Sequence, residues 1–138
     1  MLFDHLGIDV VNLTVAQAFY DEALKPLQIA IVHEITPEQT GGSAVLGYGK
    51  TADSRDIQAG KPSFWIAEGP RSSGHIHLAF VAANQAEVDA FHAAALAAGG
   101  TDNGAPGPRP HYHPGYYGAF VIDPDGNNVE AVFHGGVA

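Results

Sequence analysis

The chain has 138 residues, of which 46% are hydrophobic and 15% charged, a length typical of one domain with a sizeable core. Six basic and fifteen acidic residues give a formal net charge of −9. Because Lys and Arg form no cluster, we expect neither a nucleic-acid partner nor an anionic membrane surface. Cysteine is absent, which excludes disulfides and thiolate metal sites. No signal peptide or membrane span is predicted, so we expect a cytoplasmic protein.

The chain contains an internal repeat. Residues 5–24 align without a gap with residues 77–96, an offset of 77 − 5 = 72 residues, and seven of the twenty positions are identical. The identical pairs are His5/His77, Leu6/Leu78, Asn12/Asn84, Ala18/Ala90, Phe19/Phe91, Ala23/Ala95 and Leu24/Leu96. We therefore expect a single domain over residues 1–138, built from two similar modules at about residues 1–70 and 73–136.

Both copies of the repeat predict a strand, a turn and a helix. In the first module, the apolar spacing predicts a strand at 3–11, a helix at 14–24 capped by Thr14, and strands at 29–35, 44–48 and 63–67. In the second, it predicts a strand at 76–82, a helix at 85–98 with Leu96 facing inward, a Gly- and Pro-rich loop at 101–117, and strands at 118–122 and 128–133 around a turn at 123–127. Each half is thus a βαβββ unit, and two such units can share one curved sheet.

The helix-free faces of three predicted strands present two histidines and a carboxylate. Alternation places His5 and His77 opposite the apolar residues of their strands, and Glu130 opposite Val129 and Ala131. Two histidines and one carboxylate suit a divalent transition metal with open coordination positions. The simpler alternative is that each strand histidine is an ordinary surface residue. A buried, unpaired Glu130 would cost several kcal/mol, so we expect a metal or a protonated histidine beside it.

Further polar and aromatic residues are candidates for a substrate pocket. The segment 109–117 combines prolines with imidazole and phenol side chains, which suits the wall or lid of a small-molecule pocket. The alternative is a loop that packs its own aromatic residues. From this segment we expect His113 and Tyr117 to act in catalysis together with Glu130. The candidates for substrate binding are Asp9, Trp65, His75, His111 and Tyr116.

Four segments resemble motifs of the vicinal oxygen chelate superfamily, the group of glyoxalase I, fosfomycin-resistance and bleomycin-resistance proteins and extradiol dioxygenases. They are Asp4-His5-Leu6-Gly7-Ile8-Asp9-Val10, Ala18-Phe19-Tyr20, His75-Ile76-His77-Leu78-Ala79-Phe80 and Phe120-Val121-Ile122-Asp123-Pro124-Asp125-Gly126-Asn127-Asn128-Val129-Glu130. The last segment is the most specific, and the resemblance covers essentially the whole chain. The resemblance implies an α+β fold in which two βαβββ modules form a cup-shaped mixed sheet with helices on its outer face.

The resemblance also implies metal ligands on the first and last strands of each module. At the matching positions these are His5, His77 and Glu130, in agreement with the argument from strand faces. The fourth position falls on Phe64 or Trp65, and neither is a ligand. This departure weakens the similarity to glyoxalase I itself, whose proton shuttle depends on both carboxylate positions. The resemblance further implies a homodimer.

These observations predict a metalloenzyme of this superfamily. His5, His77 and Glu130 would hold one divalent ion (zinc, manganese, iron or nickel) that binds adjacent oxygens of a small-molecule substrate as a Lewis acid, with lyase, transferase and dioxygenase chemistry left open. The alternative is a metal-free binding protein, resembling the bleomycin-resistance members, that sequesters a small aromatic or cationic ligand. The net charge of −9 and the aromatic residues Trp65, Tyr112, Tyr116 and Tyr117 suit that alternative. Histidines at both equivalent strand positions favour the metal.

Overall fold

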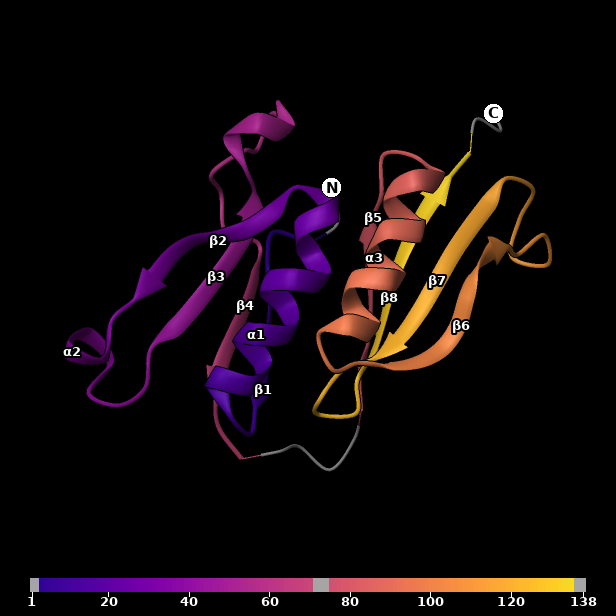
Figure 1. Ribbon diagram of the computed structural model, residues 1–138. Coiled ribbons are helices and arrows are strands. Elements are labelled where there is room, and N and C mark those ends of the chain that lie inside the picture. Colours follow the sequence, from indigo (N-terminus) through magenta and orange to yellow (C-terminus); the bar gives the residue numbers. More distant parts are fainter. Residues whose placement is uncertain (1–2, 71–74, 136–138) are drawn as a thin grey trace.

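The computed structural model describes residues 3–70 and 75–135 and shows two modules with the same order of elements (Figure 1). The first module contains β1 (Leu6–Val10), α1 (Leu13–Leu24), β2 (Ile29–Ile35), β3 (Val45–Lys50) and β4 (Phe64–Glu68). The second contains β5 (His77–Val81), α3 (Gln85–Ala97), β6 (Thr101–Pro108), β7 (Tyr116–Ile122) and β8 (Asn128–His134). Short helices lie at η1 (Lys25–Leu27), α2 (Pro37–Thr40) and η2 (Ala52–Ser54). The predicted α+β fold with two βαβββ modules is confirmed.

Each module forms its own four-stranded mixed sheet, in the orders β1-β4-β3-β2 and β5-β8-β7-β6. The first and last strands of each module run parallel to one another, and the remaining neighbours are antiparallel. Within the described residues, β1 and β5 each pair on one side only, so the two modules form two sheets rather than one continuous sheet. The strands that begin at or next to His5 and His77 therefore lie at sheet edges.

The main helix of each module begins at an asparagine that the repeat conserves between its two copies. The side chain of Asn12 accepts a hydrogen bond from the backbone N–H of Val15 at 3.0 Å, and that of Asn84 accepts one from Glu87 at 2.8 Å. Such caps satisfy an otherwise unpaired donor and contribute about 1 kcal/mol each. The prediction that Thr14 caps the first helix is wrong, because α1 already begins at Leu13.

Helices α1 and α3 lie side by side where the two modules meet (Figure 1). The absence of a side chain at Gly100 permits this contact, since a Cβ there would lie 2.8 Å from the Phe19 ring on α1. The buried residues of α3 are Val88, Phe91 and Ala95. Leu96, which was predicted to face inward, is 36% exposed, because it lies beside this buried stripe rather than on it.

The turn at 123–127 stabilises the contact between the modules. The Tyr20 hydroxyl on α1 donates to Asp123 Oδ2 at 2.6 Å, and the backbone N–H of Val11 donates to Asp125 Oδ1 at 2.9 Å. Within the turn, Asp123 also accepts from the backbone N–H groups of Asp125 and Asn127. Burial is the larger cause, and the neighbouring Asp123 the next, of a pKa for Tyr20 that lies well above its usual value. The most specific sequence motif thus has a structural role.

The segment at 101–117, predicted as a loop, contains a strand. β6 pairs antiparallel with β7 and forms the outer edge of the second sheet. Its register shifts between Asp102 and Gly104 and again between Gly104 and Gly107. Glycine and proline are tolerated there because one side of an edge strand needs no partner. The β6–β7 loop is therefore confined to residues 109–115.

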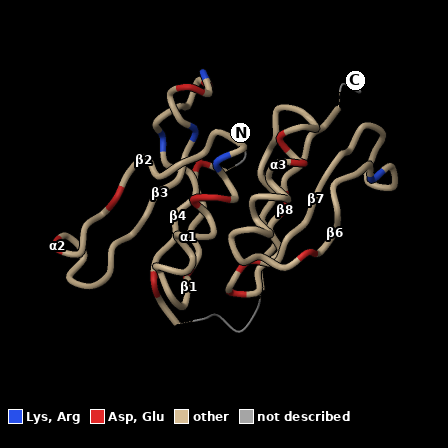
Figure 2. Tube along the Cα trace, in the orientation of Figure 1, with Lys and Arg blue, Asp and Glu red and all other residues tan. Residues whose placement is uncertain are grey.

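Charged side chains are spread over both modules (Figure 2). Arg55 belongs to the β3–β4 connection of the first module, and Arg109 belongs to the β6–β7 loop of the second. This distribution agrees with the absence of a basic cluster in the sequence. Across residues 3–70 and 75–135, no helix has the length and apolar character needed to cross a membrane.

Candidate functional site

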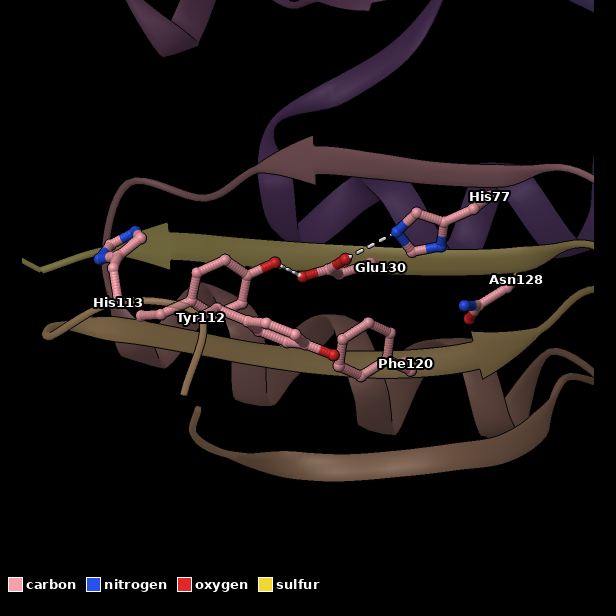
Figure 3. A pocket seen from close by; sticks show the side chains of 7 residues that line it. His77, Tyr112, His113, Phe120, Asn128 and Glu130 are labelled. Atoms are coloured by element: carbon pink, nitrogen blue, oxygen red, sulfur yellow. Dashed lines mark hydrogen bonds and ion pairs between the residues drawn. The ribbon is translucent and has the colours of Figure 1, made fainter. Parts of the chain in front are cut away.

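The face of the second sheet that turns away from α3 carries a pocket of about 560 Å³ (Figure 3). We call it the Glu130 pocket, and its lining comes from β5, β7, β8 and the β6–β7 loop: His77, Tyr112, His113, Tyr116, Phe120, Asn128 and Glu130. Val129 and Ala131, which alternate with Glu130 along β8, are fully buried in the core. Strand alternation therefore separates the core face from the pocket face, as the sequence predicts.

Glu130 is the buried polar group of this pocket, with 2% of its surface exposed. His77 Nε2 donates a hydrogen bond to Glu130 Oε1 at 3.0 Å, and the Tyr116 hydroxyl donates to Oε2 (Figure 3). Gly118 leaves room for the carboxylate, since a Cβ there would lie 3.2 Å from Oε2. Each carboxylate oxygen thus has a donor, which offsets the cost of burying the charge.

The tyrosine and the aromatic ring beside Glu130 organise the rest of the pocket. Burial, together with the hydrogen bond to Glu130, raises the pKa of Tyr116 above its usual value. Tyr116 therefore keeps its proton at neutral pH and acts as a donor. Phe120 lies directly opposite Glu130 in the β7–β8 pairing, and its ring stacks on that of His77 at 6.1 Å.

The β6–β7 loop is anchored to the end of β8 by two imidazoles. His113 Nε2 lies 2.8 Å from His134 Nδ1, and His113 Nδ1 lies 2.7 Å from the carbonyl oxygen of Pro114. Because a carbonyl only accepts, Nδ1 of His113 carries the hydrogen. The Tyr116 ring packs edge-on against both imidazoles, at 5.3 and 5.4 Å. These contacts hold the loop at the mouth of the Glu130 pocket.

The first sheet carries a second pocket, of about 680 Å³. We call it the Trp65 pocket, and it is lined by Asp4, His5, Gly7, Ile35, Val45, Lys61, Pro62 and Trp65. His5 Nδ1 donates to Asp4 Oδ2 at 2.7 Å, and Lys61 Nζ lies 2.9 Å from Asp4 Oδ1. His5 and then Lys61 lower the pKa of Asp4. In the neutral imidazole, Nε2 then keeps its lone pair, as in the carboxylate–histidine arrangement that supports many metal sites.

The strand registers identify Trp65 as the counterpart of Glu130. The repeat equates Gly7 with Ala79, because 79 − 7 = 72. Gly7 lies opposite Trp65 in the β1–β4 pair, and Ala79 lies opposite Glu130 in the β5–β8 pair. The sequence left this position open between Phe64 and Trp65. The structure assigns it to Trp65, whereas Phe64 is buried in the core.

The structure brings four of the predicted site residues together, namely His77, His113, Tyr116 and Glu130. His5 and Trp65 line the other pocket. Tyr117, predicted to be catalytic, lies on the opposite face of β7 from Tyr116, and its hydroxyl donates to Asp89 on α3 at 2.7 Å. That hydrogen bond raises the pKa of Tyr117. The expected role of Tyr117 in the pocket is thus not supported by its position.

The other three predicted substrate-binding residues lie outside both pockets. Asp9 lines a smaller hollow with Gly7, Ile8, Ile76 and Asn127. His111 is exposed in the β6–β7 loop, with its ring 4.3 Å from that of Tyr112. His75 is exposed ahead of β5.

Several residues of the Glu130 pocket were not predicted as site residues. Asn128 shares the pocket face of β8 with Glu130, so strand alternation could have identified it. Phe120 could be placed only with the β7–β8 register, which the sequence does not give. His134, the last residue of β8, is outside the pocket lining and supports it through His113, a contact between residues 21 positions apart in the sequence.

The predicted metal ligands are divided between the two pockets. Within residues 3–70 and 75–135, no group of three or more His, Cys, Asp or Glu side chains is placed to hold a metal ion. One chain brings His77 and Glu130 together and places His5 in the Trp65 pocket. When a nitrogen and an oxygen each bind one ion at about 2.0–2.2 Å, with a right angle at the ion, the two ligand atoms lie about 3 Å apart. The His77–Glu130 separation of 3.0 Å therefore fits two neighbouring ligands of one ion.

Comparisons with known proteins agree with this architecture. The sequence model of a family described as "Glyoxalase/Bleomycin resistance protein/Dioxygenase superfamily" matches residues 2–131. A search of curated proteins found no match. Among solved structures, a glyoxalase/bleomycin resistance protein from Albidiferax ferrireducens T118 is 28% identical, with a TM-score of 0.72 and coverage of 96% of this chain and 98% of that one.

Two further structures share the fold at lower identity. A glyoxalase/bleomycin resistance protein/dioxygenase family enzyme from Burkholderia phytofirmans PsJN is 20% identical, with a TM-score of 0.65 and coverage of 95% and 97% of the two chains. An E144Q mutant of glyoxalase I from Zea mays is 18% identical, with a TM-score of 0.65. The match covers 94% of this chain and 46% of the Zea mays chain.

Proposed function

Since the chain belongs to the Glyoxalase/Bleomycin resistance protein/Dioxygenase superfamily, we propose that it is an enzyme that uses one divalent metal ion to bind two adjacent oxygens of a small-molecule substrate. Zinc, manganese, iron and nickel all suit a site of two histidines and one carboxylate with open positions. When bound, the ion would supply Lewis-acid stabilisation of negative charge on a substrate oxygen.

The observation that carries this proposal is the pairing of His77 with the buried Glu130. A carboxylate that is 2% exposed is costly unless a cation or strong donors face it. His77 Nε2 lies 3.0 Å from Oε1, a spacing that hydrogen bonding and shared metal binding both allow. The pair lines an open pocket, where a metal ion and a substrate could reach it.

The third ligand, His5, would come from a second copy of the chain. His5 lies immediately before β1 and His77 begins β5. Within the described residues each of these strands has one side without a paired neighbour, and residues of both strands line a further pocket of the same chain. Exposed apolar side chains flank these edges, including Phe3 at 63% and Val81 at 65%. Apolar side chains at open sheet edges favour association. A homodimer could then bring the Trp65 pocket of one chain against the Glu130 pocket of the other.

The remaining pocket residues would position the substrate and move a proton. Glu130 would hold a proton taken from the substrate, and the Tyr116 hydroxyl would orient the carboxylate by donating to Oε2. His113 would bind the substrate at the mouth of the pocket, where its contact with His134 holds the loop. Tyr117 has no part in this scheme, because its hydroxyl is bonded to Asp89.

The second candidate is a metal-free binding protein for a small aromatic ligand. It is favoured by Trp65, which occupies the position where a fourth ligand would lie, and by the aromatic lining of the Glu130 pocket. The two candidates differ in whether the protein binds metal, so metal content decides between them.

The test is the metal content per chain of protein purified without chelator or histidine tag and then reloaded with Zn²⁺, Mn²⁺ or Fe²⁺. We expect about one equivalent per chain in the wild type and less than about a tenth of that in His77→Ala and Glu130→Gln, because each removes a ligand. His92→Gln is the matched control, since His92 forms a comparable 2.9 Å contact with Asp102 outside the pocket.

Each result of this test bears on the proposal. Loss of metal in both pocket variants, with full content in His92→Gln, supports it. A wild type that stays metal-free after reloading contradicts the enzyme proposal and favours the binding protein. Full metal content in both pocket variants also contradicts it, because the ligands would then lie elsewhere.

A further inference from the structure

The Trp65 pocket replaces a ligand position with an aromatic surface. Trp65 holds in the first sheet the place that Glu130 holds in the second, as the paired registers show. The residue at the position equivalent to the buried carboxylate is thus a tryptophan whose indole ring lines an open pocket. An indole cannot bind a divalent ion, so a ligand would have to use this position in another way.

The surroundings of Trp65 hold its ring in one place. A Cβ at Gly47 would lie 2.8–2.9 Å from atoms Cζ3 and Cη2 of the indole, so the six-membered ring lies directly against the Gly47 backbone. His33 packs edge-on against the indole at 5.9 Å. Any side chain at position 47 would displace the ring. The half-buried indole of Trp65, supported by Gly47 and His33, therefore presents a preformed flat surface to the pocket.

The remaining lining indicates which chemistry this surface would accept. Ile35, Val45 and Pro62 add apolar walls. The charged groups at the rim compensate one another, because Lys61 Nζ lies 2.9 Å from Asp4 Oδ1. With no uncompensated charge among the described lining residues, the pocket favours an uncharged ring over a cation.

We infer that Trp65 is a specificity-determining residue that stacks on a planar, uncharged aromatic ring of the substrate. This inference rests on the proposed function in one respect, since the two oxygens next to the ring would be bound at His77 and Glu130. The ring itself requires only the Trp65 pocket. The substrate class is therefore an aromatic compound with two adjacent oxygens on a substituent of the ring.

The test uses two hydroxamate probes with different rings, and Trp65→Leu separates the contribution of the indole from any difference in chelating strength. Benzohydroxamate and cyclohexanecarbohydroxamate carry the same pair of oxygens, but the ring is flat and aromatic in the first and saturated and puckered in the second. A merely hydrophobic pocket would favour the saturated ring, whereas stacking favours the aromatic one. Because Trp65 is the chain's one tryptophan, its fluorescence reports on this pocket alone. Affinities are measured by calorimetry on metal-loaded protein.

We expect benzohydroxamate to bind about threefold to tenfold more tightly than the saturated probe and to change the Trp65 emission. Trp65→Phe retains most of this preference because it keeps an aromatic face, and Trp65→Leu abolishes it. The preference is a ratio of two affinities, so a general loss of folding or metal would not imitate it. Circular dichroism of both variants establishes that they fold.

Four results distinguish this inference from the proposed function. The aromatic preference with an emission change supports the inference. Equal affinities that depend on metal, without an emission change, overturn it and leave the proposed function intact. An aromatic preference that persists unchanged in Glu130→Gln and without metal supports stacking at Trp65 but contradicts the metal-dependent function. Failure of both probes to bind the metal-loaded wild type overturns the inference.

Discussion

Replacing Tyr116 with Phe removes one hydroxyl from the Glu130 pocket and keeps the ring. Glu130 is 2% exposed, and this hydroxyl is the donor to its Oε2. A hydrogen bond to a charged group contributes about 1.5–3 kcal/mol, so we expect the free energy of unfolding to fall by about 2 kcal/mol. For 138 residues, an unfolding entropy of about 2.1 cal/mol/K per residue converts this loss to a melting temperature about 7 °C lower.

The assay is thermal unfolding followed by circular dichroism, with wild type and variant at equal concentration. Tyr112→Phe is the matched control: Tyr112 lines the same pocket, but its hydroxyl has no hydrogen bond to the described residues, and we expect a change within about 0.5 kcal/mol. Saturating Zn²⁺ should reduce the effect of Tyr116→Phe, because the ion would take the carboxylate as a ligand. Equal melting temperatures for the two variants without metal would refute the pairing of Tyr116 with Glu130.

Two further predictions concern tyrosine residues. Tyr20→Phe removes the 2.6 Å bond to buried Asp123 and should lower the free energy of unfolding by about 2 kcal/mol in a urea titration; a loss below about 0.5 kcal/mol would contradict the role given to the turn. Burial raises the pKa values of Tyr20, Tyr48 and Tyr116 above 10.0, so the folded chain binds more protons than the unfolded chain at higher pH. Stability should therefore be full below pH 10 and fall as the pH rises above it. Tyrosinate absorbance that rises at the same pH in folded and urea-unfolded protein would show that this reasoning is wrong.

The fold was predictable because its signals are local and occur twice. The identical pair Asn12/Asn84 indicated where each helix follows its strand, and both asparagines are N-caps. Alternation along 128–133 gave the two faces of β8 correctly. β6 was missed because its Gly- and Pro-rich sequence has no strand periodicity of its own. It is a strand only through its pairing with β7, and the two register shifts in that pairing have no signal in the sequence.

The site was predictable in part for the same reason. Strand alternation places His77 and Glu130 on the same helix-free face, so their proximity was predictable. In the structure, His77 Nε2 lies 3.0 Å from Glu130 Oε1. The separation of His5 from this pair does not follow from it, because the repeat gives equivalent positions but not the arrangement of one module against the other. That arrangement depends on the packing of α1 on α3 and on the bond between Tyr20 and Asp123.

The central claim is that each metal site combines His5 of one chain with His77 and Glu130 of another. The most direct measurement is the metal content of a mixture of His5→Ala and Glu130→Gln chains, unfolded together in equal amounts and refolded. In a mixed dimer one site keeps all three ligands and the other loses two, so random pairing should restore about a quarter of the wild-type metal. Each variant refolded alone should bind almost none. A mixture that binds no more metal than the separate variants would contradict the shared site.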